Sequence, residues 1–74
     1  MDDKLRIIVA EVLSVSIEDV GPETSPATQP RWDSLRHMNL VFAIEDAFGV
    51  QFDDEVVPTL TSVTAIEKAL ARCN

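Results

Sequence analysis

The sequence predicts an all-α fold, a four-helix bundle of three main helices and one short helix, with a long loop between the first two helices. Apolar residues recur at the spacing of a helix face in three separate segments. Prolines and glycines fall between those segments, and no two segments form a credible pair of strands. At 74 residues the chain has room for one small core, so we expect residues 1–74 to form a single domain.

The first helix is expected over about residues 3–14. Its apolar residues fall at i, i+3, i+4, i+7 and i+8 and therefore share one face: Leu5, Ile8, Val9, Val12 and Leu13. Asp2 and Asp3 stand at its start, where the helix dipole favours negative charge.

A long connection follows, from Ser14 or Val15 to Asp33. Three prolines prevent a continuous helix there: Pro22, Pro26 and Pro30. The segment Ser16–Asp19 is expected to form one short turn. Apolar residues are expected to anchor the loop to the bundle: Ile17, Val20 and Trp32. A loop of this length in a small domain is often functional.

The second helix is expected over Ser34–Phe48, a run without glycine or proline. Asp33 is its candidate N-cap, and Gly49 supplies a stop. Residues 50–52 are expected to be extended, and residues 53–57 to form a short helical turn that Pro58 ends. The last helix is expected over about Ser62–Arg72, capped by Thr61 or Ser62, with a buried stripe of Val63, Ile66, Ala69 and Leu70.

The second helix carries two apolar faces. The expected core face contains Leu40, Val41, Ile44, Ala47 and Phe48. The roughly opposite side carries Leu35, Met38 and Phe42, flanked by Glu45 and Asp46. Because so few other helices are available to cover it, this second stripe predicts an exposed binding surface. The alternative is that Phe42 or Leu35 packs into the bundle beside the long loop.

Ser34 is the hydroxyl whose position suggests chemistry. It follows the expected N-cap in the first helical turn, where backbone N–H groups and the helix dipole favour an attached phosphate. Serine is common near helix starts, so this position taken alone favours a simple capping role over a modification site.

The motif Asp33-Ser34-Leu35 at the head of this helix resembles the attachment motif of acyl and peptidyl carrier proteins. Other segments are similar to the same family, and the similarity covers nearly the whole chain. They are the first helix, Ile17-Glu18-Asp19-Val20, Leu40-x-x-x-Ile44-Glu45-Asp46-x-Phe48-Gly49-Val50, and Leu60-Thr61-Ser62-Val63 before the last helix.

The resemblance implies a covalent phosphopantetheine arm on Ser34, between Asp33 and Leu35. A separate phosphopantetheinyl transferase would install it from coenzyme A with magnesium, and the arm's thiol would carry an acyl or aminoacyl group as a thioester between partner enzymes of a biosynthetic pathway. The residues that the resemblance implies for partner recognition are Leu35, Arg36, Met38, Phe42, Glu45 and Asp46. The core of the bundle is also expected to shelter part of an acyl chain, as in some relatives.

Two residues depart from the fatty-acid-type pattern, which usually has acidic residues where this chain has Arg36 and Asn39. The segment Trp32-Asp33-Ser34-Leu35-x-His37 is more similar to free-standing carriers of specialised pathways, such as surface-polysaccharide, polyketide and nonribosomal-peptide-type systems. The competing interpretations are an aminoacyl or peptidyl carrier and an unmodified helical interaction module.

The charge balance excludes a nucleic-acid partner, because 13 acidic residues against 6 basic residues give a net charge of −7. No apolar run approaches the ~20 residues that span a bilayer. The acidic start does not resemble a signal peptide, and the single cysteine, Cys73, permits no internal disulfide. These features predict a cytoplasmic protein, and a monomer is the simplest expectation.

No catalytic or metal site is expected. His37 stands one turn after Ser34, which admits a small hydrolase as a rival, but its expected role is packing at the edge of the core or contact with the long loop. One histidine and one cysteine are too few ligands for a zinc site. The segment Asp53-Asp54-Glu55 is interpreted as a solvated acidic turn.

Overall fold

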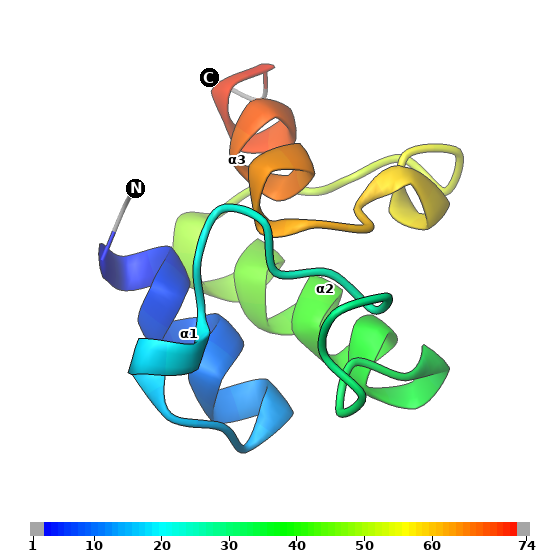
Figure 1. The fold of residues 1–74 in the computed structure, drawn as a ribbon. Coiled ribbons are helices and arrows are strands. Elements are labelled where there is room, and N and C mark those ends of the chain that lie inside the picture. Colours follow the sequence, from blue (N-terminus) through cyan, green and yellow to red (C-terminus); the bar gives the residue numbers. More distant parts are fainter. Residues whose placement is uncertain (1–2, 73–74) are drawn as a thin grey trace.

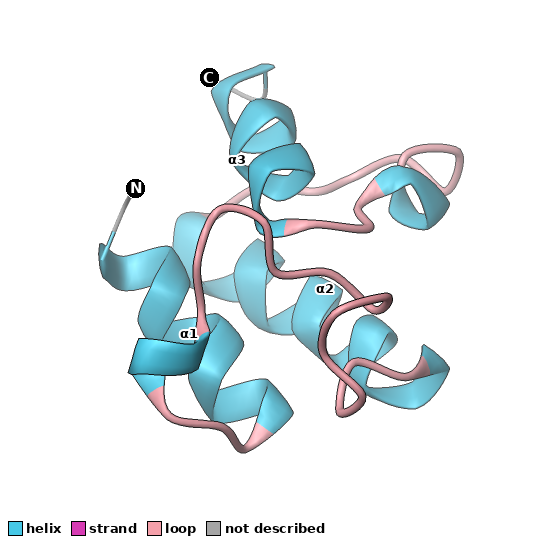
Figure 2. Cartoon of the chain, viewed as in Figure 1, coloured by secondary structure: helices cyan, strands magenta, loops and turns pink. Residues whose placement is uncertain are grey.

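The computed structural model describes residues 3–72 and contains three α-helices and two 3₁₀ turns in this range, with no strand (Figures 1 and 2). The helices are α1 (Asp3–Leu13), α2 (Ser34–Phe48) and α3 (Val63–Arg72), and the 3₁₀ turns are η1 (Ile17–Asp19) and η2 (Val57–Thr59). The predicted all-α architecture with a long loop between the first two helices is confirmed, the short element being a 3₁₀ turn. The expectations for Asp2 and Cys73 fall outside the described residues.

Helix α1 ends one residue earlier than predicted. Ser14 adopts a left-handed backbone with φ 57°, and its N–H donates to the carbonyl of Glu11 over 3.3 Å. The N–H of Val15 donates to the carbonyl of Ala10 over 3.0 Å. These two bonds form a Schellman motif, which satisfies the last carbonyls of the helix and turns the chain into the loop.

Helix α2 has the predicted bounds because both ends are capped as expected. The Asp33 carboxylate accepts from the N–H of Arg36 at the start, and Gly49 ends the helix with φ 64°. Of the expected core face, Leu40, Val41 and Ile44 are buried, while Ala47 and Phe48 are half-buried. Helices α1 and α2 pack against each other, and α3 closes the core with Val63, Ile66 and Ala69, while Leu70 is half-buried.

The short turn before α3 differs from the prediction. Residues 54–56 form a turn, and the 3₁₀ helix η2 follows over Val57–Thr59 with Pro58 inside it. Proline was expected to end this turn, but its fixed φ suits the first positions of a helix. Helix α3 is capped by Ser62 rather than Thr61, since the Ser62 Oγ accepts from the N–H of Ala65 over 3.0 Å.

The long loop runs from the end of α1 to the start of α2 (Figure 1), and it is held to the bundle at several points. Val20 and Trp32 are buried as predicted, and Ser16 caps η1 as predicted. Ile17 is 39% exposed, so its predicted anchoring role is wrong; only its carbonyl is held, by the guanidinium of Arg6 over 3.1 Å. A loop that runs over the surface of the bundle buries only some of its side chains, and tertiary contacts decide which ones pack.

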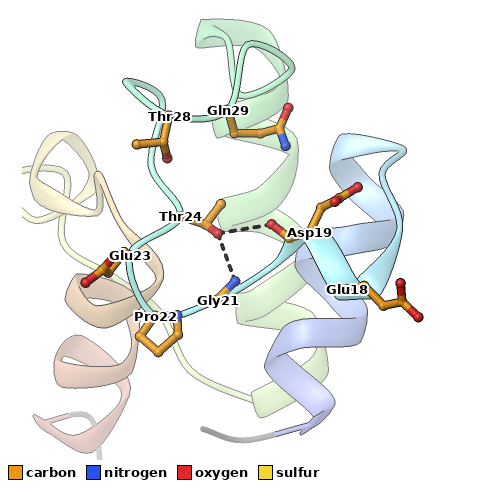
Figure 3. A pocket seen from close by; sticks show the side chains of 8 residues that line it. All are labelled: Glu18, Asp19, Gly21, Pro22, Glu23, Thr24, Thr28 and Gln29. Carbon is orange, nitrogen blue, oxygen red and sulfur yellow. Dashed lines mark hydrogen bonds between the residues drawn. The ribbon is translucent and has the colours of Figure 1, made fainter.

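Polar bonds complete the attachment of the loop. The Thr24 hydroxyl accepts from the N–H of Gly21 over 2.8 Å and donates to the carbonyl of Asp19 over 3.3 Å (Figure 3). At the other side, the hydroxyl of Thr64 in α3 donates to the carbonyl of Pro22 over 2.7 Å. The loop is thus bonded to the start of α3 through Thr64 and to α1 through Arg6.

Candidate functional site

The candidate site is built at the start of α2. Ser34 is the first residue of the helix and is exposed to solvent. The first backbone bond of the helix runs from the N–H of His37 to the carbonyl of Asp33, so the N–H groups of Ser34 and Leu35 precede the helical ladder. An anion attached to the Ser34 side chain would therefore stand at the positive end of the helix dipole.

Asp33 and Arg36 fix this helix start. One oxygen of the Asp33 carboxylate accepts from the N–H of Arg36 over 2.8 Å, and the other pairs with the Arg36 guanidinium over 3.1 Å. The same guanidinium donates to the carbonyl of Arg31 over 3.3 Å. The pair reduces the negative field that Asp33 alone would place beside Ser34, although its exposure limits the stability it contributes.

The second apolar stripe of α2 is exposed. Leu35 is 73% exposed, Met38 41% and Phe42 60%, so neither Leu35 nor Phe42 packs beneath the loop. The surface formed by these three side chains is named the α2 stripe below. Large contiguous apolar surfaces on a small protein commonly mark interaction sites.

The charged residues predicted around this stripe have different environments. Asp46 is exposed at the far end of α2. Glu45 is half-buried, and its carboxylate accepts from the N–H of Phe52 over 2.8 Å, which holds the return of the chain after α2. Arg36 is half-buried against the loop through its bonds to Asp33 and Arg31.

His37 has a structural position. Its Nδ1 accepts from the indole Nε1–H of Trp32 over 3.0 Å, and its Nε2 lies 2.9 Å from the carbonyl oxygen of Val57. Since the indole nitrogen is always a donor, Nδ1 is unprotonated and Nε2–H donates to Val57. Both ring nitrogens are engaged, so neither is free to act as a base for Ser34, and the predicted loop-contacting role is confirmed.

A pocket of about 520 Å³ lies beside Ser34. The expected site residues Asp33, Ser34 and Met38 line it together with Trp32 and His37. The other wall residues were not predicted from the sequence: Pro26, Val57, Pro58 and Thr61. No periodic pattern marks these four residues, because they belong to irregular segments that only the tertiary fold brings to α2.

A second pocket of about 520 Å³ lies in the long loop and contains none of the predicted site residues (Figure 3). Its lining residues include three acidic ones, Glu18, Asp19 and Glu23. Within residues 3–72, no group of three or more His, Cys, Asp or Glu side chains is placed to hold a metal ion. No helix in the same range is long and apolar enough to cross a membrane.

Comparisons with known proteins match most of this chain to one family. Residues 3–70 match the family model described as a phosphopantetheine attachment site. An acyl carrier protein of Thermosynechococcus vestitus is 43% identical over 61 residues, which cover 82% of this chain and 75% of the relative. Acyl carrier protein 3 of Ralstonia nicotianae is 37% identical over 73 residues, which cover 93% and 84% respectively.

The fold is also that of a solved carrier. The solution structure of a holo acyl carrier protein from Geobacter metallireducens matches with a TM-score of 0.83 and 27% identity, covering 96% of this chain and 82% of that one. With the family model and these relatives spanning most of the sequence, the chain belongs to the acyl carrier protein family, non-enzymatic helical proteins that carry acyl groups linked to phosphopantetheine.

Proposed function

We propose that Ser34 is the residue of this chain that bears the phosphopantetheine arm. The observation that carries the proposal is that Ser34 is the exposed first residue of α2. The Asp33 carboxylate caps the helix at this point. When attached, the arm supplies a thiol that holds an acyl group as a thioester. The protein supports it with the positive end of α2 and with the Arg36 guanidinium, which offsets the Asp33 charge.

The attachment reaction requires a base that takes the proton of the Ser34 hydroxyl. The Ser34 Oγ forms a bond to phosphorus while the pyrophosphate bond of coenzyme A breaks, adenosine 3′,5′-bisphosphate leaves, and the serine proton passes to the transferase. Neither nitrogen of His37 is free to take that proton, so the base belongs to the transferase. This division of labour is consistent with a carrier that a separate enzyme modifies.

We propose that the α2 stripe is the surface on which the transferase and the acyl-loading and acyl-transferring enzymes of its pathway dock. Its three apolar side chains lie on the helix that begins with Ser34, and Arg36 and Asp46 mark its two ends. Arg36 in place of an acidic residue favours specialised-pathway partners over general fatty-acid enzymes. We also propose that the protein is a cytoplasmic monomer. Loading tests with candidate adenylating enzymes would distinguish an acyl carrier from the alternative, an aminoacyl carrier.

The test is the intact mass of the purified protein after incubation with a phosphopantetheinyl transferase, magnesium and coenzyme A. We expect the wild type to gain the mass of one phosphopantetheine group and Ser34→Ala to gain none. Ser14→Gly is the matched control, because it removes another exposed hydroxyl at a left-handed position that suits glycine. Loading of Ser34→Ala would refute the assignment.

A further inference from the structure

The contacts of His37 connect three parts of the chain that the sequence separates. Trp32 at the end of the long loop donates to Nδ1, and Nε2–H donates to the carbonyl of Val57 in η2. The two rings lie 25° from coplanar with centroids 6.1 Å apart, so they meet edge to edge along the hydrogen bond. We name this arrangement of Trp32, His37 and Val57 the His37 bridge.

The bridge lies between Ser34 and the core. On α2, His37 stands one turn after Ser34 and one turn before Leu40 and Val41, so these residues follow one another along one side of the helix. Leu40 and Val41 are at most 3% exposed. Val57, the other end of the bridge, is half-buried and packs against the same core.

The pocket beside Ser34 borders the bridge. Trp32, His37 and Val57 form part of its wall, and Met38 and Pro58 add apolar surface. Its volume of about 520 Å³ is within the range of small-ligand pockets. A group attached through Ser34 therefore has apolar surface available without entering the core.

We propose that the His37 bridge closes the route from Ser34 into the core, so that the carried acyl group stays in the pocket beside Ser34 and the cargo is a short or polar acyl group. This inference rests on the proposed function of Ser34. It contradicts the expectation, stated from the family resemblance, that the core shelters an acyl chain. A long chain could enter only by separating His37 from Val57, which would leave a part-buried donor and acceptor without each other.

The experiment loads the protein through the transferase with acetyl-, butyryl- or octanoyl-coenzyme A and measures the thermal midpoint of each product. A chain buried in the core stabilises in proportion to its buried methylene groups, whereas a chain in an open pocket adds little. For the wild type we expect midpoints that do not rise from acetyl to octanoyl. A rise of about 4 °C or more in the wild type would overturn the proposal.

Two matched variants separate the two bonds of His37. His37→Gln keeps a donor near the position of Nε2 for the Val57 carbonyl, and His37→Asn keeps only an acceptor near Nδ1 for Trp32. We expect His37→Gln to show no dependence on chain length and His37→Asn to gain a rise of roughly 4 °C or more with octanoyl. A merely structural role would lower all midpoints of a variant equally, and that result would contradict the proposal.

The mass of each sample is measured before heating, which distinguishes the two claims. Failure to load any acyl form would refute the assignment of Ser34 and this inference with it. If wild type, His37→Gln and His37→Asn all load completely and their midpoints depend on acyl length in the same way, the proposed role of the His37 bridge is refuted. The assignment of Ser34 would then stand.

Discussion

At the residue scale, the start of α2 depends on a few polar side chains with defined partners. Asp33 is the clearest case, because its two oxygens serve different purposes. One oxygen caps the helix, and the other neutralises Arg36 beside Ser34. The sequence was sufficient to predict the cap, because an aspartate before a helical run is a local signal.

The cap predicts the behaviour of two variants. Asp33→Ala removes the acceptor for the N–H of Arg36 and is expected to lower the free energy of unfolding by about 1 kcal/mol. Asp33→Asn keeps a capping oxygen and loses only an exposed ion pair, so we expect a much smaller change. Urea unfolding monitored by circular dichroism measures both, and equal losses would contradict the capping role.

The partner of His37 could not have been predicted at this scale. Its helical register indicated a place at the edge of the core, which is correct. The Val57 carbonyl lies 20 residues away in an irregular turn, and no residue-type preference marks a backbone acceptor. The same limit applies to Pro58 and Thr61 in the wall of the pocket.

At the scale of elements, α2 shows how much of a helix can be predicted from its local sequence pattern. Its bounds were predicted from Asp33 and Gly49 and its two apolar faces from residue spacing, because capping and amphipathicity act within one helix. The turn around Pro58 was misplaced, since proline is compatible with both the end of one turn and the start of another. The exposure of the α2 stripe followed from the shortage of helices to cover it.

The two faces of α2 predict opposite outcomes for neighbouring substitutions. Leu40→Ala removes a fully buried side chain and is expected to cost about 2–5 kcal/mol of stability. Phe42→Ala removes a side chain that is 60% exposed and is expected to change stability by no more than about 0.5 kcal/mol.

The same Phe42→Ala protein is expected to load more slowly than the wild type in the transferase assay, because its docking surface is smaller. Denaturation curves and the initial loading rate are the measurements. A loading rate equal to that of the wild type would argue against the α2 stripe as the transferase surface.

At the scale of the whole molecule, the long loop joins all three helices. Arg6 in α1, the buried Thr24 of the loop and Thr64 in α3 all contribute hydrogen bonds that hold it. The loop in turn delivers Trp32 to His37 beside Ser34. The apolar residues of the loop predicted that it is held to the bundle. The exposure of Ile17 shows that the assembled bundle decides which of these residues are buried.

Thr24 tests the contribution of this attachment. Thr24→Val keeps the shape of a buried side chain but leaves the N–H of Gly21 without its acceptor, so we expect a loss of about 1–3 kcal/mol. Thr24→Ser retains the hydroxyl and is expected to lose less. Chemical denaturation distinguishes the two, and a valine variant as stable as the wild type would show that the bond contributes nothing.

The central claim is that one hydroxyl at the head of α2 carries the arm. Fragmentation mass spectrometry of the transferase-treated wild type locates the added group on a single residue. The account predicts phosphopantetheine on Ser34 and on no other serine or threonine. Modification at another residue, or full-length folded protein that stays unmodified with an active transferase, would contradict it.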